Sequence, residues 1–496
     1  MRCYLNGNPL LRASTNLRGV LHMSENDSLE KTLRLRDVYA IATGTMFSSG
    51  FFLLPGLAVA ETGPSVVLAY LVSGVIVLPS MLSMAELATA LPRAGGTYFI
   101  IDRSLGPLLG TIGGWGAWLA LVLKSCFALI GMGAYLRLLF DVNITLVAVV
   151  LTVLLGGLNL LGANHTKKLQ NLLIAGLVLI LVFYLLQGVV YVFSLNVREV
   201  LPDRFTPFFS KGTYGFFTTV GMVFVSYAGL TNVASVAEEV EDPGRNIPLG
   251  MVLALTTSLM VYVVGVGILV AVLSPEGLSQ DLSPVATAGE KIFSWIPASW
   301  GNLIIVIAAG AAFASTGNAG ILSASRYPMA MSRDHLISPL FARVGKTGVP
   351  HWSIAVTLVT MIVVLVGFNV REVAKLASAF QLLLFGLLNL SVILMRESQI
   401  EGYTPAYRAP WYPWLQVFGI LFSAILIFEM GLLPFLFTLA VCVSAGIWFR
   451  VYAQDRVDRK GAIFHVHAEL GKQKDPGLEQ EMSDVTDEKE EAASDS

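Results

Sequence analysis

The sequence predicts an all-α integral membrane protein with twelve transmembrane helices. They are expected to form a 5+5 inverted repeat, with broken first and sixth helices, plus two extra helices. Of the 496 residues, 55% are hydrophobic and only 13% are charged. Apolar runs of roughly 20 residues, long enough to cross a bilayer, recur from about Val38 to about Tyr452. The 32 Lys and Arg against 34 Asp and Glu give no basic excess, which argues against nucleic acid as a partner.

The chain divides into three parts by composition. Residues 1–36 are expected to form a polar cytoplasmic leader, residues 37–452 the twelve-helix domain, and residues 453–496 an acidic, disordered tail. The expected spans lie at about 38–61, 65–90, 106–136, 143–161, 170–194, 214–238, 247–273, 299–326, 352–369, 373–395, 411–430 and 432–452.

Basic residues predict the orientation of these spans. An even number of spans places both termini on one side, and Lys and Arg are enriched in cytoplasmic loops. The leader carries Lys31, Arg34 and Arg36, and the loops on its side are richer in Lys and Arg than the opposite loops. Both termini are therefore predicted to be cytoplasmic, in a multi-pass protein of the cell membrane.

Two of the expected spans contain small and polar residues at their centres. The first includes ATGTMFSSGFFLLPG, from Ala42 to Gly56, and the sixth includes SYAGLTN, from Ser226 to Asn232. Such residues weaken a helix where a membrane span would favour leucine. Since an odd number of spans, five, separates the two breaks, the second unit is inserted upside down relative to the first. The repeats are expected at about 38–194 and 214–395, and the extra helices at about 411–452.

Breaks of this kind have a chemical use. Unwound backbone in hydrocarbon leaves N–H and C=O groups unpaired, so it is tolerated only against protein, water or a ligand. Freed amides at the start of a half-helix suit a carboxylate, and freed carbonyls suit an ammonium or a sodium ion. A ligand with both charges, an α-amino acid, matches such a site. The alternative is that the small residues only allow close helix packing.

Three motifs resemble permeases of the amino acid–polyamine–organocation (APC) superfamily. They are SSGFFLLPG in the first span, MAELATALPRAGGTYFIIDRSLGPLLGTIGGWGAW from Met84 to Trp118, and VASVAEEVEDPGRNIP after the sixth span. The resemblance covers about residues 37–452. It implies two inverted five-helix units with two extra helices, and transport of amino acids or related cations by alternating access rather than catalysis.

The resemblance also implies roles for residues at the first break. Ser48, Ser49 and Gly50 are expected to offer backbone amides and a hydroxyl to the substrate carboxylate. Thr45 and Met46 are expected to offer carbonyls to the amine.

At the second break, Tyr227 and Ala228 are expected to add further carbonyls for the amine. Gly229 would leave room for the substrate side chain, and Leu230 would line that space. Thr231 stands where members that prefer cationic substrates often carry an acidic residue. A neutral or small amino acid is therefore favoured.

A candidate sodium site follows from the same resemblance. Ser315 and Thr316 match two adjacent hydroxyl residues of sodium-coupled members, and the carbonyls of Gly44, Phe47 and Ala312 would complete the site. The alternative is that both hydroxyls bond to their own helix. A sodium ion or a proton is the expected coupling ion, and no cofactor is expected.

Lys124 lies about halfway along the third expected span. A lysine at that depth costs about 2.5–3.5 kcal/mol on insertion scales, so it should face a cavity or a partner. It could supply a cation, hold a substrate carboxylate or chloride, carry the coupled proton, or form a structural ion pair. The lysine that proton-coupled or exchanging relatives often place in the fifth span is absent, since Leu177 matches that position.

Two other functions remain as alternatives. An inorganic cation or chloride cotransporter of the same superfamily fits Thr231 and Lys124 too. A membrane-embedded enzyme would need a nucleophile–base pair or a metal cluster at membrane depth, and the six histidines lie in loops, leader or tail. The expected partners are a small-molecule substrate and the lipid bilayer, and the sequence leaves the oligomeric state open.

Overall fold

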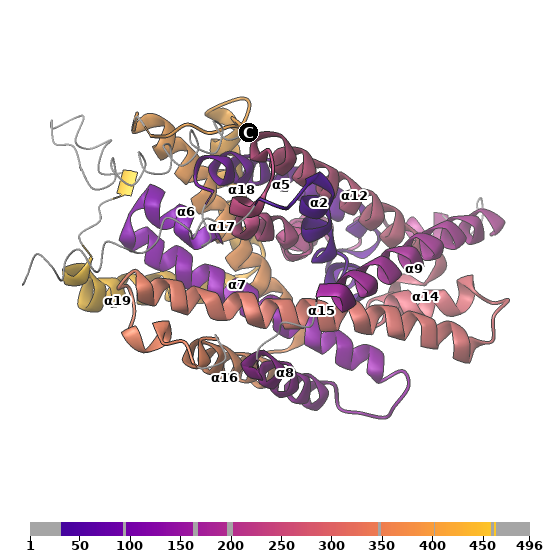
Figure 1. The fold of residues 1–496 in the computed structure, drawn as a ribbon. Helices are drawn as coiled ribbons and strands as arrows, with labels where there is room; N and C mark the ends of the chain where they lie inside the picture. The colour runs from indigo at the N-terminus through magenta and orange to yellow at the C-terminus, as the bar shows by residue number, and fades with distance from the viewer. Residues whose placement is uncertain are drawn as a thin grey trace, which may run out of the picture.

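A computed structural model shows the chain as a bundle of helices (Figure 1). It describes residues 31–92, 96–161, 167–195, 202–345, 349–400, 402–457 and 461–462. Within these ranges there is no β-strand, and one isolated bridge joins Leu33 to Val240. The all-α prediction is confirmed. Nearly all of the expected leader and most of the expected tail lie outside the described residues.

The helices follow the apolar segments of the sequence. Their bounds are α2 Leu35–Gly44, α3 Ser49–Phe52, α4 Leu54–Thr62, η1 Gly63–Ser65, α5 Val66–Ala90, α6 Gly96–Leu105, α7 Pro107–Leu136, α8 Ile144–Leu161, α9 Lys167–Ser194, α11 Gly212–Met222, η2 Val223–Glu239, α12 Pro243–Val272, α13 Pro275–Leu278, α14 Pro284–Ile292, α15 Ala298–Arg333, η3 Pro339–Ala342, α16 His351–Gly367, α17 Val370–Glu397, α18 Trp414–Glu429, α19 Leu432–Trp448, η4 Phe449–Ala453 and η5 Gln454–Arg456.

Many of these helices have the length and composition of membrane spans. In the described part of the chain, 8 are long and apolar enough to cross a bilayer. Shorter apolar helices lie at Ile144–Leu160, His351–Gly367 and Trp414–Glu429. Length and composition thus indicate a multi-pass membrane protein. The count of twelve spans and the inverted repeat stay predictions.

The long helices α7 and α15 form the axis of the bundle. They run side by side through the molecule, with α8 and α16 along one side of the pair and the group α2, α5 and α12 on the other (Figure 1).

The predicted break in the first span is confirmed. α2 ends at Gly44, residues 45–48 form a turn, and α3 begins at Ser49. Ser48 has φ −132° and ψ −119°, which is not a helical conformation. The Phe47 amide still donates to the Thr43 carbonyl, but the Ser48 amide donates to the Met46 carbonyl, so the helical hydrogen-bond pattern ends at Ser48.

The second predicted break takes a different form. The break was expected as unwinding at Ser226–Asn232. Instead, the chain changes from α11 to the 3₁₀-helix η2 at Val223. The physical reason is a side chain from α17. The Ser378 hydroxyl donates to the Met222 carbonyl at 2.6 Å and accepts from the Val225 amide at 3.1 Å. A side chain inserted into the backbone hydrogen bonds in this way interrupts an α-helix.

The first broken segment comprises α2 and α3, and the second comprises α11 and η2. The start of the first segment and the end of the second are joined at one end of the bundle. Leu33, just before α2, pairs with Val240, just after η2. Next to this bridge, the Arg34 Nε lies 3.1 Å from a Glu241 carboxylate oxygen. The two segments are therefore held together at this end of the bundle.

Glu86 is a buried charge with several partners. It is 0% exposed, and its carboxylate accepts from Arg396 at 2.8 and 2.6 Å. It also accepts from the Tyr403 hydroxyl at 2.8 Å and from the Ala409 amide at 2.7 Å. Burial and then the neighbouring carboxylate raise the pKa of Tyr403, so its hydroxyl stays protonated and donates. Glu86 thereby fastens the α17–α18 connection to α5.

Glu86→Gln is expected to destabilise the protein by about 3–5 kcal/mol, because an amide leaves the partly buried Arg396 guanidinium without its counter-charge. The melting temperature of the purified protein measures this. Glu397→Gln is the matched control, since Glu397 is exposed and Tyr412 is its one hydrogen-bond partner among the described residues. Equal melting temperatures for both variants would show that the Glu86 contacts do not stabilise the fold.

Candidate functional site

The first and second broken segments contact each other at Gly229. A Cβ on Gly229 would lie 2.6 Å from the Thr45 hydroxyl and 2.8 Å from Met46 Cγ. The Asn232 amide nitrogen donates to the Thr45 hydroxyl at 3.0 Å. In this conformation the space beside Gly229, expected to hold a substrate side chain, is filled by the first segment. Gly229 instead allows the two segments to approach closely.

Two buried tyrosines, Tyr262 and Tyr70, bond to the backbone of these segments, and a third, Tyr227, bonds to the backbone of α5. The Tyr262 hydroxyl donates to the Met46 carbonyl at 2.7 Å and lies 3.1 Å from the Ser226 carbonyl. The Tyr70 hydroxyl donates to the Gly50 carbonyl at 2.8 Å. The third tyrosine, Tyr227, donates to the Tyr70 carbonyl at 2.8 Å. The Met46 carbonyl, expected to face an amine, is thus bonded to Tyr262.

Sequence reasoning missed Tyr70 and Tyr262. Both lie in long apolar helices, α5 and α12, where a tyrosine reads as an ordinary packing residue. Their rings contact each other, with centroids 5.2 Å apart. Only the fold places their hydroxyls against the carbonyls that the breaks release.

The amide side of the first break is different. Ser48 and Ser49 are buried, and the Ser48 hydroxyl has no hydrogen-bond partner among the described residues. Within the same residues, no bond engages the amides of Ser49 and Gly50. Leaving a buried polar group unpaired costs about 1–3 kcal/mol, so such groups are places where a ligand can bind favourably. The carboxylate role of these residues stays a prediction.

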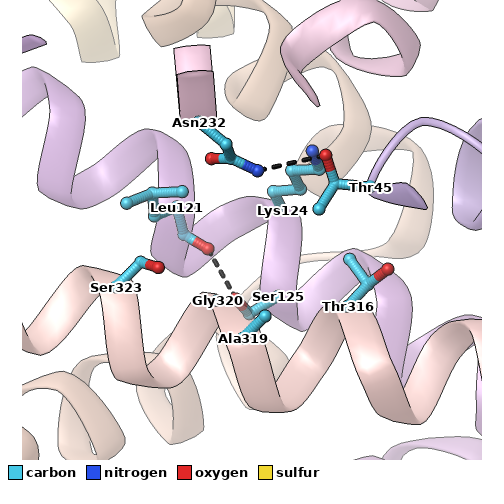
Figure 2. A pocket seen from close by; sticks show the side chains of 9 residues that line it. All are labelled: Thr45, Leu121, Lys124, Ser125, Asn232, Thr316, Ala319, Gly320 and Ser323. Atoms are coloured by element: carbon cyan, nitrogen blue, oxygen red, sulfur yellow. Dashed lines mark hydrogen bonds between the residues drawn. The ribbon is translucent and has the colours of Figure 1, made fainter. Parts of the chain in front are cut away.

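A pocket lies next to the first break, between α7, α15 and η2. Figure 2 shows Lys124 from α7 reaching toward the side of the pocket formed by Thr45 and Asn232. The full lining is Thr45, Leu121, Lys124, Ser125, Asn232, Thr316, Ala319, Gly320 and Ser323. The structure therefore brings together three predicted site residues from three separate segments: Thr45, Lys124 and Thr316.

Lys124 is unusual within this lining. Its side chain is 7% exposed, and it makes no hydrogen bond or ion pair with any described residue. The structural ion pair considered for it is therefore not found in the described part of the chain. Thr316 is also buried, and its hydroxyl has no partner there. An ammonium and a hydroxyl, both unpaired, thus border the same pocket.

The other candidate sodium ligands lie outside this lining. Ala312 is buried and Ser315 is half-buried on α15, while Gly44 and Phe47 flank the turn after α2. None of these four residues borders the pocket. The sodium site stays a prediction.

The remaining predicted residues belong to η2. Tyr227, Ala228 and Leu230 are buried, and the Thr231 hydroxyl donates to the Ala228 carbonyl at 2.8 Å. The Ala228 carbonyl, like that of Met46, therefore has a donor in this conformation.

Sequence reasoning also missed polar residues of the pocket itself: Ser125, Asn232 and Ser323. Asn232 closes the polar stretch of the sixth span, and that position was the available signal. Ser125 follows Lys124 directly, and its hydroxyl donates to the Leu121 carbonyl at 2.7 Å. Ser323 carries no sequence signal beyond its place on the helix that holds Thr316.

Comparisons with known proteins identify relatives over most of the chain. The family model described as amino acid permease matches residues 37–454, which include every residue of the pocket. The chain is 25% identical over 441 residues to the branched-chain amino acid permease BcaP of Bacillus subtilis (strain 168), covering 82% of this chain and 90% of the relative. It is 24% identical to the permease of the same name from Lactococcus lactis subsp. cremoris (strain MG1363), covering 87% of this chain and 95% of the relative. It is 26% identical to the cationic amino acid transporter 3, mitochondrial, of Arabidopsis thaliana, covering 77% of this chain and 65% of the relative.

Proposed function

Because the chain belongs to the amino acid permease family, we propose that it is a secondary active transporter that moves a neutral or small amino acid by alternating access. Permeases of this family are transporters, so the chain is not an enzyme. A sodium ion or a proton is the proposed coupling ion, and no other cofactor is proposed.

The unpaired groups at the first break carry this proposal. The Ser48 hydroxyl and the amides of Ser49 and Gly50 are hydrogen-bond donors without partners in the described residues. A substrate carboxylate accepts several such bonds at once, and bonds to a charged acceptor are roughly twice as strong as neutral ones. The substrate amine would take the place of the tyrosine and threonine hydroxyls that now donate to the carbonyls of Met46 and Ala228.

The proposed topology is twelve spans, with an inverted repeat at about 38–194 and 214–395. The 8 long apolar segments and the three shorter ones make eleven, and one of the 8, Leu54–Ala90, contains both α4 and α5. Assigning α4 with α2 and α3 to the first span, and α5 to the second, supports twelve. Both termini are proposed to lie in the cytoplasm and the protein in the cell membrane, since the loops on the leader's side are richer in Lys and Arg.

The proposed substrate class rests on Thr231 and on the relatives. Thr231 bonds its own backbone and adds no negative charge to attract a cationic side chain. The relatives named for branched-chain amino acids are covered over 90% and 95% of their length, and the cationic transporter over 65%. Both observations favour a neutral side chain.

A second candidate function is cotransport of inorganic cations with chloride. The unpaired ammonium of Lys124 favours it, since a chloride ion could neutralise that charge. The family and its relatives favour the amino acid function.

An uptake screen tests the main proposal. The purified protein is reconstituted into liposomes, and each labelled amino acid is offered with and without an inward sodium gradient. Saturable uptake of a neutral amino acid is expected, with no uptake in protein-free liposomes. Transport of rubidium and chloride, with no amino acid taken up, would favour the second candidate.

The double variant Ser315→Ala/Thr316→Ala is expected to raise the sodium concentration for half-maximal uptake. Two hydroxyl ligands are lost, at about 1 kcal/mol or more each, which predicts a rise of roughly tenfold or more. Thr360→Ala is the matched control, because its hydroxyl bonds its own helix at the Val356 carbonyl. If the uptake rate of the unaltered protein does not depend on sodium concentration, the proposed sodium site is wrong.

A further inference from the structure

The pocket between α7, α15 and η2 contains one ionisable side chain, the Lys124 amine, and no carboxylate. Its lining residues are apolar, hydroxyl-bearing or amide-bearing, apart from Lys124. Lys124 is 7% exposed, so little water reaches its side chain. Holding an unpaired ammonium in such surroundings is costly, and a bound anion would remove most of that cost.

The free hydrogen-bonding capacity of the pocket also suits an anion. The Lys124 ammonium can donate up to three hydrogen bonds, and it makes none with the described residues. The buried Thr316 hydroxyl has no partner either. By contrast, Ser125 already donates to the Leu121 carbonyl, and Asn232 to the Thr45 hydroxyl. The ammonium can only donate, so a ligand that binds it must accept, and the Thr316 hydroxyl can donate to the same ligand.

We infer that Lys124 and the Thr316 hydroxyl form a subsite for a small, singly charged anion. The anion is free chloride, or it is the single carboxylate of the substrate, which would then bind here instead of at the amides of the first break. The second source rests on the proposed function, whereas the first does not. An anion beside the ammonium also removes the repulsion that a cation near Thr316 would feel.

Thermal melting of the purified full chain in detergent tests the subsite without any transport. Sodium concentration and ionic strength are held constant, and a bulky sulfonate anion is replaced stepwise by chloride. Parallel series in the sulfonate salt add L-leucine or L-glutamate. A ligand that binds only the folded state raises the melting temperature in a saturable way. We expect such a rise in chloride, in the amino acids, or in both.

Lys124→Met is expected to lower the affinity for the anion that causes the shift by about tenfold to a hundredfold. This is the effect of losing one hydrogen bond to a charged group. Thr316→Val, which keeps the side-chain shape, should lower this affinity less. Lys211→Met is the matched control, because it removes one exposed lysine charge and should leave the shift unchanged. A rise in chloride identifies the free ion, and a rise in the amino acids alone identifies the substrate carboxylate.

Two results would overturn the subsite. One is an unaltered protein whose melting temperature is the same in every series. The other is a Lys124→Met variant that keeps the full shift at the same anion concentration. The proposed function fails separately, if the anion shift is present but no amino acid is transported.

Discussion

Gly50→Leu is expected to abolish amino acid uptake while the protein still inserts into the membrane. A Cβ at this position would lie 2.6 Å from the Ser226 hydroxyl oxygen and 2.9 Å from the Tyr262 hydroxyl oxygen. These distances are too short for a carbon atom, so the first segment would have to move away from η2 and α12. The leucine would also cover the unpaired Gly50 amide. Insertion should persist, because leucine is among the most favourable residues in a span.

The control for this variant is Gly267→Leu. Gly267 lies in the long apolar helix α12, and a Cβ there would meet nothing within 4 Å. The two variants are compared for the amount of protein in the membrane and for initial uptake rate per molecule. Normal uptake by Gly50→Leu would refute the functional reading of the first break.

Lys124→Met is expected to lower uptake by roughly tenfold to a hundredfold and to leave the melting temperature at least as high as in the unaltered protein. The loss follows from removing the one charge in the pocket lining. The unchanged or raised stability follows because methionine has a similar volume and no ammonium to desolvate. Lys124→Arg keeps the charge with a different shape and should retain at most part of the uptake.

A purely structural lysine predicts the reverse result. Removing one partner of a buried ion pair would destabilise the fold by about 3–5 kcal/mol and leave the chemistry of the remaining site intact. Melting temperature and uptake rate are therefore measured on the same purified variants. A methionine variant that melts early, yet transports normally for its folded fraction, would reject the functional role of Lys124.

Hydropathy was sufficient to predict the helices, because bilayer thickness sets their length and forces the backbone to pair within each helix. The third span was expected at about 106–136, and α7 runs from Pro107 to Leu136. The break after Gly44 was also predictable, since Gly, Ser and Thr in a row weaken a helix locally. These features depend on residues that are neighbours in the chain.

The features that escaped prediction depend on side chains from distant segments. Ser378 comes from α17, and it determines where α11 gives way to η2. Tyr262 comes from α12, and its hydroxyl donates a hydrogen bond to the Met46 carbonyl that was expected to face a ligand. A single sequence shows no spacing that links these residues to the breaks they contact.

The candidate site was predicted in part for the same reason. Lys124 stood out because a charge at membrane depth is costly anywhere. Thr316 was predicted from the family resemblance, because it and Ser315 match two adjacent hydroxyl residues of sodium-coupled members. Their meeting with Thr45 in one pocket required the packing of α7 against α15. Ser323, with no sequence feature of its own, was found only through that packing.

The most direct measurement of the central claim is concentrative uptake. Liposomes containing the purified protein receive a labelled neutral amino acid at equal concentration inside and outside, and an inward sodium or proton gradient is then imposed. A secondary active transporter raises the internal concentration above the external one, and an ionophore that collapses the driving gradient abolishes this accumulation. An internal concentration that stays equal to the external one under both gradients would contradict the account.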